Sequence, residues 1–187
     1  MDFYNVIENR VSYKKFKNDS IDRDSLQRMI NSAMNSPSYK NNTSYKIIIV
    51  EDDNIKNSLS NCIRNSTSEM SEAVKDTPVT CVVIGKPENS GVMNGKDFYL
   101  MDGAIAMEHF VLSAAAEGYG TCWVTEFDEN EIKRMLNIPS DYKVIALTPV
   151  GKPNETKESH VKKDVREYVF MNEFNEPFTI NDSALKY

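Results

Sequence analysis

The stretch from residue 100 to residue 117 constrains the fold of this chain more than any other part of the sequence. Apolar residues cover nearly the whole circumference of a helix built on it. A narrow stripe at steps of three or four carries the small and polar residues Asp102, Ala106, His109, Ser113 and Glu117, and Glu108 lies on the opposite side. A helix this apolar is normally buried on most of its faces. Other elements must therefore surround it, and we interpret His109 as an interior or interface residue.

Helical periods and short apolar runs alternate along the rest of the chain. Strands are expected at residues 47–50, 79–84, 121–125 and 142–149. Helices are expected from Asp2 to residue 9 or 10, over residues 23–34, 54–65 and 69–75, and from a capping box at 128–131 to Leu136. Residues 85–96 contain glycines and a proline and predict a flexible loop, either a lid or a disordered excursion. The pattern indicates an α+β or α/β class with a mixed sheet flanked by helices, in a single domain over residues 1–187.

Composition and charge exclude several classes of protein. The chain carries 22 Lys and Arg against 28 Asp and Glu, a net charge of -6, which argues against a nucleic-acid binder that works through general phosphate attraction. No apolar run reaches the length of a membrane span, and the start of the chain does not read as a secretory signal. Cys62, Cys81 and Cys122 are odd in number and widely spaced, as expected for reduced thiols in a cytoplasmic protein.

A polar loop at residues 36–45 leads directly into the strand expected at 47–50. Pro37 should end the preceding helix. Ser38 and Asn41 offer groups that donate and accept hydrogen bonds, and Tyr39 supplies a flat ring, so the loop could line a polar ring ligand. Taken alone, the same residues favour a solvated turn between helix and strand.

A second polar group precedes this loop. Arg10, Ser12 and Lys14 provide a guanidinium fork, a hydroxyl and an ammonium within one short segment. Such a set suits a phosphate dianion. A solvated cationic patch is the alternative interpretation.

Four blocks of the sequence resemble the FMN-dependent nitroreductase family, in the order that the family has them. Residues 8–16, ENRVSYKKF, resemble its opening Arg-Arg-Ser-x-Arg-x-Phe, and residues 36–48 resemble its Ala-Pro-Ser-x-x-Asn-x-Gln-Pro-Trp loop and strand. Residues 117–127 resemble its Gly-x-Gly-x-x-Trp segment, and residues 138–153 resemble its Ile-Pro to Gly-x-Pro block. The resemblance implies the α+β nitroreductase-type fold, with a mixed β-sheet flanked by helices, in a domain-entwined homodimer with residues 100–117 at the interface.

The resemblance also implies positions for a cofactor, which would be FMN. Arg10, Ser12 and Lys14 match positions that hold the phosphate and the ribityl chain. Pro37, Ser38, Tyr39 and Asn41 match a loop that covers the flavin bound mainly by the other subunit, and the backbone near Thr125 and Glu126 would approach the flavin ring. Lys162 or Lys163 would complete the phosphate site, although a solvated basic run is equally consistent there. Val11 and residues 43–45 depart from the family pattern.

The implied activity is that of an NAD(P)H oxidoreductase. Hydride from NADH or NADPH would pass through flavin N5 to a nitroaromatic, a quinone or a related small-molecule electron acceptor, with no side chain as nucleophile or metal ligand. The departures at Val11 and residues 43–45 motivate an alternative, a flavin-binding or dimeric interaction protein with weak turnover. A cysteine-dependent redox enzyme using Cys122 is a third possibility. The aromatic tail after residue 167 could wrap over a second subunit.

Overall fold

A central four-stranded sheet organises the computed structural model, which describes residues 2–65, 67–157 and 164–185. The strand order is β1 (Tyr45–Val50), β2 (Val79–Gly85), β6 (Lys143–Gly151) and β5 (Gly120–Thr121). Neighbouring strands pair antiparallel, and Ser12 adds an isolated parallel bridge to Thr121. Strands and helices together confirm the predicted α+β class. No helix in the described part of the chain combines the length and apolar character that crossing a membrane requires.

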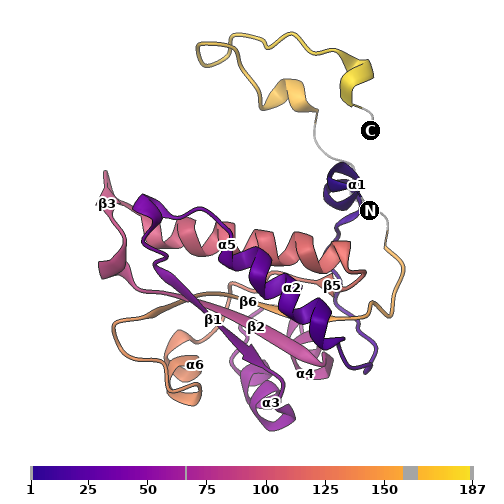
Figure 1. Cartoon of the computed structure of the whole chain (residues 1–187), viewed down its shortest axis with the longest axis vertical. Coiled ribbons are helices and arrows are strands. Elements are labelled where there is room, and N and C mark those ends of the chain that lie inside the picture. Colours follow the sequence, from indigo (N-terminus) through magenta and orange to yellow (C-terminus); the bar gives the residue numbers. More distant parts are fainter. Residues whose placement is uncertain (1, 66, 158–163, 186–187) are drawn as a thin grey trace.

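Helices cover both faces of the sheet (Figure 1). On one face lie α2 (Arg23–Met34) and α5 (Phe98–Ala116), and on the other lie α3 (Asp53–Asn61), α4 (Glu69–Asp76) and α6 (Glu129–Met135). Strand β2 is buried along its whole length, with Cys81 and Val83 in the core beside α5 and Val82 and Ile84 in the core beside α3. A strand covered on both sides has no solvent-facing positions, which explains its continuous apolar run.

The helix starts follow the capping residues that the sequence predicted. Asp2, Asp22 and Asp128 accept a hydrogen bond from the backbone N–H three residues on, at the starts of α1 (Phe3–Asn9), α2 and α6. The helix predicted over 54–65 instead begins after Asp52 and ends at Asn61, because Ile63 leaves the helix to bridge Phe127.

The strand predicted at 121–125 is wrong beyond Thr121. The backbone N–H of Cys122 donates to the Thr148 hydroxyl at 3.1 Å, so a side chain replaces the next carbonyl of the ladder. Pairing resumes only at Val124, in an isolated bridge with Leu147. The turn between α5 and β5 is set by Gly118, whose φ of +76° lies in the left-handed region that glycine adopts at helix ends.

Residues 85–96 form defined structure where the sequence suggested an irregular loop. A 3-10 turn at Pro87–Asn89 leads into a hairpin of β3 (Val92–Met93) and β4 (Lys96–Asp97). Asn94 and Gly95 have φ of 53° and 74°, the left-handed pair that a type I′ hairpin turn needs. Val92 and Met93 at the hairpin are each 64% exposed.

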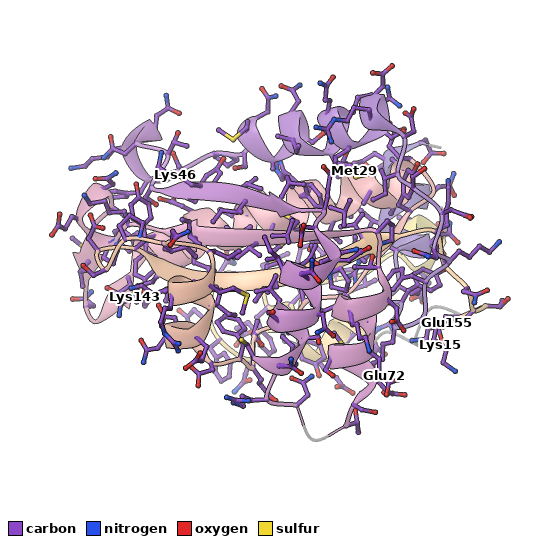
Figure 2. All side chains as sticks on the ribbon, turned by 90° about the horizontal axis from the view of Figure 1, so that it is seen from below. Lys15, Met29, Lys46, Glu72, Lys143 and Glu155 are labelled. Atoms are coloured by element: carbon purple, nitrogen blue, oxygen red, sulfur yellow. The ribbon has the colours of Figure 1, made fainter. Side chains whose placement is uncertain are left out.

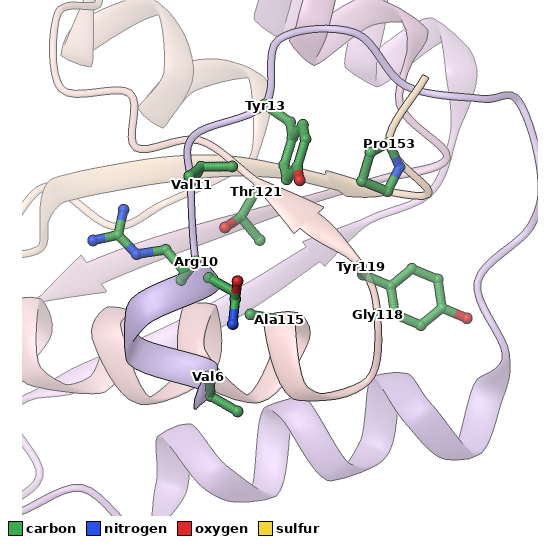
Figure 3. A pocket seen from close by; sticks show the side chains of 10 residues that line it. Val6, Arg10, Val11, Tyr13, Ala115, Gly118, Tyr119, Thr121 and Pro153 are labelled. Atoms are coloured by element: carbon green, nitrogen blue, oxygen red, sulfur yellow. The ribbon is translucent and has the colours of Figure 1, made fainter. Parts of the chain in front are cut away.

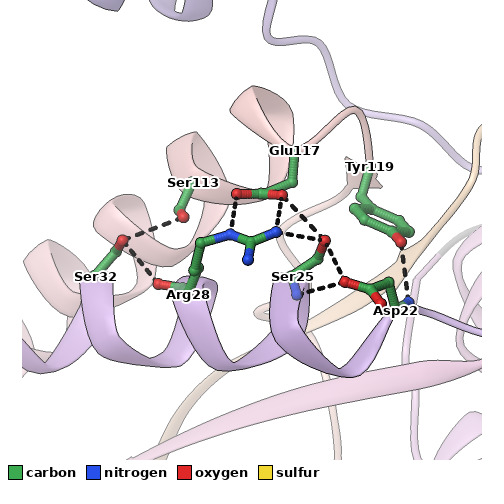
Figure 4. Close-up of polar contacts among 7 residues, drawn as sticks. All are labelled: Asp22, Ser25, Arg28, Ser32, Ser113, Glu117 and Tyr119. Carbon is green, nitrogen blue, oxygen red and sulfur yellow. Dashed lines mark hydrogen bonds and ion pairs between the residues drawn. The ribbon is translucent and has the colours of Figure 1, made fainter.

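The polar stripe of α5 faces α2 and is hydrogen-bonded there (Figure 4). Glu117 accepts two hydrogen bonds from the Arg28 guanidinium, at 2.6 Å from Nε and 2.8 Å from Nη2. Ser113 and Ser32 are joined through their hydroxyls at 3.1 Å, and His109 Nδ1 lies 3.2 Å from the Ser32 carbonyl oxygen. A second stripe of α5, formed by Met101, Ile105 and Leu112 with the half-buried Glu108 among them, is mostly apolar and open to solvent, with Met101 46% and Ile105 37% exposed.

The tail at residues 164–185 lies apart from the sheet and its helices, drawn in orange and yellow in Figure 1. It contains the 3-10 helices η3 (Val165–Glu167) and η4 (Asp182–Leu185), and Arg166 pairs with both Asp164 and Asp182. Phe174 in this tail is 80% exposed.

Candidate functional site

Arg10 follows α1 and lines a pocket of about 180 Å³ beside the C-terminal end of α5, with its guanidinium directed away from Tyr119 and Pro153 (Figure 3). Val11, the departure from the family pattern, is buried next to it and lines the same pocket with Ala115 and Gly118. The Nε atom of Arg10 is buried and has no hydrogen-bond partner within the described residues. An unpaired buried donor is costly, so this guanidinium is a candidate for binding an anion.

Ser12 and Lys14 lie on the extended segment after Arg10, which runs beside Thr121. Ser12 is exposed, whereas Lys14 Nζ is 2.6 Å from Glu69 Oε2 on α4. The hydrogen bond between these two side chains raises the pKa of Lys14 and lowers that of Glu69. Lys14 is therefore already paired with Glu69, whereas the exposed Ser12 side chain contacts the Cys122 thiol.

A lysine that sequence reasoning missed lies beside this segment. Lys157 Nζ donates to the Ser12 carbonyl at 2.9 Å and pairs with Glu155 at 3.3 Å. Glu155 also accepts the backbone N–H groups of Lys14 and Lys15, and Figure 2 shows Lys15 and Glu155 side by side. The one available signal was that Lys157 belongs to the same charged stretch as Lys162 and Lys163. Those two lysines lie outside the described residues.

Thr125 and Glu126 are exposed in the segment that connects Val124 to α6. The Glu126 carbonyl accepts the backbone N–H of Arg64 at 2.9 Å, which fixes this segment against the end of α3. Because Thr121 pairs with Ser12, the segment continues from the same edge of the sheet as the Arg10 to Lys14 stretch.

The loop with Pro37, Ser38, Tyr39 and Asn41 lies at the other end of α5. Pro37, Ser38 and Tyr39 line a groove of about 330 Å³ with Phe98, Met101, Asp102 and Ile105, whereas Asn41 is exposed and does not line it. The rings of Tyr39 and Phe98 are in contact, with centroids 4.8 Å apart and an interplanar angle of 47°. The groove therefore has an aromatic and apolar wall that suits a flat ring.

Asp102 connects α5 to this loop, a role that the sequence did not reveal. Its side chain is 3% exposed and accepts the Tyr39 backbone N–H at 2.7 Å and the Ser44 hydroxyl at 2.6 Å. The Ser90 hydroxyl donates to it at 3.3 Å. Sequence periodicity predicted that Asp102 lies on the polar stripe of the helix, but it could not predict which groups donate hydrogen bonds to it.

One chain does not bring the two groups of predicted residues together. The Arg10 pocket includes Ala115, whereas the groove includes Asp102, and these positions are about 20 Å apart along the axis of α5 at 1.5 Å per residue. Helix α5 therefore separates the predicted phosphate residues from the predicted ring-covering loop.

The described thiols are shielded from solvent. Cys81 is fully buried, and Cys122 is 7% exposed with its Sγ 3.6 Å from Met70 Sδ. Burial raises the pKa of both thiols, which keeps them protonated. This environment disfavours a mechanism with a cysteine nucleophile.

Residues 7–152 match the model of the Nitroreductase family, and the chain belongs to that family. It is accordingly an oxidoreductase of the nitroreductase type. A nitroreductase family protein of known structure from Clostridium novyi NT is 49% identical to it, covers 95% of this chain and 98% of its own, and superposes with a TM-score of 0.81.

More distant relatives match most of the chain. An FMN-dependent nitroreductase from Clostridium difficile R20291 is 23% identical, covers 91% of this chain and 99% of its own, and has a TM-score of 0.79. An iodotyrosine deiodinase from Thermotoga neapolitana is 21% identical over 182 residues, which span 87% of this chain and 94% of that protein.

Proposed function

We propose that this protein is an FMN-dependent NAD(P)H oxidoreductase that acts as a homodimer and reduces nitroaromatics, quinones or related acceptors. The observation that carries the proposal is the separation of Arg10 from the Tyr39 loop by α5. If both groups contact one cofactor, a second copy must supply one of them. The shared flavin sites then lie between two subunits.

The apolar stripe of α5 supports the homodimer. Met101 and Ile105 are 46% and 37% exposed, and the half-buried Leu112 continues the same side of the helix, which also carries the half-buried Glu108. Helix α1 adds Phe3 and Ile7, which are 63% and 42% exposed. Exposed apolar surface of this extent usually marks a protein interface.

The residues at the site fit FMN. Arg10 offers an unpaired Nε donor for a phosphate, and the Ser12 side chain and the Lys157 ammonium, which is paired with Glu155, lie close to it. Lys14 would have to contact the phosphate while its ammonium also pairs with Glu69. Lys162 and Lys163 stay proposed as further cations. The groove at Pro37, Ser38 and Tyr39 offers the flat apolar wall that an isoalloxazine ring requires.

When bound, FMN would supply the redox chemistry, accepting hydride from NADH or NADPH at N5 and delivering it to the second substrate in a ping-pong sequence. The protein itself would position the cofactor, supply charges and hydrogen-bond donors around it, and shield it from water. Arg10 would hold the phosphate, and the backbone near Thr125 and Glu126 would lie at the edge of the ring. The loop from Pro37 to Asn41 would exclude water from the ring face.

We also propose that residues 1–187 form one domain, because both cores are built on a single sheet and residues 164–184, which lie apart from it, contain no buried residue that would form another core. The buried thiols Cys62, Cys81 and Cys122 suit a reducing compartment, which favours the cytoplasm.

A second candidate is a flavin-binding protein with weak turnover. Two observations favour it: Lys14 is paired with Glu69, and Val11 is buried where the family has a second basic residue. Both reduce the cationic charge available at the site.

The visible absorption spectrum of the purified protein tests both candidates. We expect a flavin spectrum that bleaches when NADH or NADPH is added without oxygen and returns when a quinone or a nitroarene is added. A flavin spectrum that neither nicotinamide bleaches would favour the second candidate. Colourless protein that does not take up added FMN would overturn the proposal.

A further inference from the structure

We propose that Asp102 is a positioning residue that holds the loop at residues 38–44 in a strained conformation and thereby shapes the groove. The contacts that hold the loop lie within one chain. Its consequence for the cofactor rests on the proposed function.

The loop contains an unusual run of left-handed residues. Lys40, Asn41 and Thr43 have φ of 51°, 58° and 48°. This region is unfavourable for residues with a Cβ atom, least so for Asn and most so for β-branched residues such as Thr. Such conformations persist only where the surrounding structure over-determines them. Something must therefore hold this loop.

The hydrogen bonds of Asp102 bracket the strained residues. Oδ1 accepts the Tyr39 N–H immediately before them, and Oδ2 accepts the Ser44 hydroxyl immediately after them. Within the same loop, the Thr43 N–H donates to the Ser38 hydroxyl at 2.9 Å. Asp102 has no ion-pair partner in the described part of the chain, so these donors and Ser90 are what stabilise its buried side chain. The loop and the side chain thus depend on each other.

A third segment, at residues 90–91, contacts both Asp102 and the loop. Ser90 donates to Asp102, and the neighbouring Gly91 packs directly against the loop. A Cβ atom added at Gly91 would lie 2.9 Å from Cε1 of Tyr39, closer than side chains normally approach. The Tyr39 ring is therefore confined between the backbone of Gly91 and the ring of Phe98.

Asp102 consequently determines the position of Tyr39, whose ring forms the aromatic wall of the groove. It acts through the Tyr39 backbone and the Ser44 hydroxyl and need not touch the cofactor or the substrate. In the proposed dimer, loss of Asp102 would displace the loop that covers the ring bound by the partner subunit.

Hydrogen exchange of the peptide spanning residues 36–46, followed by mass spectrometry, tests this inference without any cofactor. In Asp102→Ala we expect exchange in this peptide to accelerate roughly tenfold or more, as the loss of a hydrogen bond to a charged group predicts. Asp102→Asn should restore part of the protection, because its amide oxygen can still accept the Tyr39 N–H. Glu117→Ala is the matched control, since it removes a hydrogen-bonded carboxylate from the far end of the same helix and should leave the loop unchanged.

Wild-type exchange of the loop in Asp102→Ala would overturn the inference. If that variant does not fold, Ser44→Ala removes one side of the bracket, and the same comparison decides the matter. Flavin retention is the second measurement, expected to fall in Asp102→Ala and to recover in Asp102→Asn. Faster loop exchange in a protein whose wild type binds no FMN would support the positioning role and contradict the proposed function alone.

Discussion

Arg10 and Tyr39 lie at opposite ends of helix α5 in the same chain. Arg10 shares its pocket with Ala115 and Gly118, whereas Tyr39 packs on Phe98 in the first turn of the helix. The polar stripe of α5 is covered by α2, and its apolar stripe is exposed. This arrangement accounts for the apolar character of α5. We propose that a second copy of the chain covers its exposed stripe.

Replacement of Arg10 by Ala should weaken FMN binding. Loss of a charge-assisted contact to the phosphate typically costs about 1.5 to 3 kcal/mol, so the dissociation constant should rise at least tenfold. Fluorescence titration of the apoprotein with FMN measures it. Lys15→Ala is the control, because the side chain of Lys15 is exposed and only its backbone N–H contacts Glu155. Equal affinities for wild type and Arg10→Ala would remove Arg10 from the site.

A carboxylate in place of Ile105 should separate the subunits. The side chain lies in the middle of the apolar stripe, and an interface would leave the new charge buried without a partner. Sedimentation velocity should show a monomer for Ile105→Asp and a dimer for wild type. Asn57→Asp, which adds the same charge at an exposed position of α3 on the other face of the sheet, should remain dimeric. A dimeric Ile105→Asp would place the interface elsewhere.

Stability at acid pH should depend on Glu117. The hydrogen bond from Arg28 lowers the pKa of Glu117 to about 2, below the ordinary value of 4.5. A carboxyl with a depressed pKa in the folded state stabilises the fold fully above pH 4.5 and loses this contribution as the pH falls towards 2. Because the Arg28 side chain is 55% exposed, the contribution at neutral pH should be about 1 kcal/mol or less.

Urea unfolding of wild type and Glu117→Gln at a series of pH values measures this contribution. The difference between the two free energies of unfolding should be largest near neutral pH and should shrink on acidification. A difference that stays constant down to pH 2 would mean that the ion pair does not contribute as described.

Cys122→Ser should retain oxidation of NAD(P)H at close to the wild-type rate. The thiol is buried, and its burial raises its pKa, so it is a poor nucleophile at neutral pH. Steady-state assays with a quinone acceptor, normalised to flavin content, test this expectation. Lost turnover with retained flavin would revive the cysteine-dependent mechanism, and Cys81→Ser is the matched control for a buried thiol.

Local signals in the sequence predicted local structure well. Asp22 and the helical period after it define α2 as Arg23–Met34, and the apolar run at residues 79–84 defines β2 within one residue. The hairpin at residues 92–97 was missed although Asn94-Gly95 is a strong turn signal, because strands of two residues are too short to show alternation.

The site was harder to predict because its contacts join distant parts of the chain. Asp102 could be placed on the polar stripe of α5, but its bonds to Tyr39 and Ser44 arise from tertiary packing. Lys157 reaches Ser12 only because the segment after β6 runs beside residues 12–17 at the edge of the sheet. The roles of Arg10 and of the Pro37 loop came from the family resemblance and stay predictions.

Complementation between two inactive variants tests the shared site most directly. Arg10→Glu should abolish phosphate binding, and Ser38→Trp should fill the groove beside Tyr39, so each homodimer should lack flavin. Heterodimers isolated through two different tags carry both substitutions in one site and neither in the other if the site is shared between subunits. The account predicts one bound FMN per heterodimer. Heterodimers without flavin would show that each chain builds its site alone and would contradict the account.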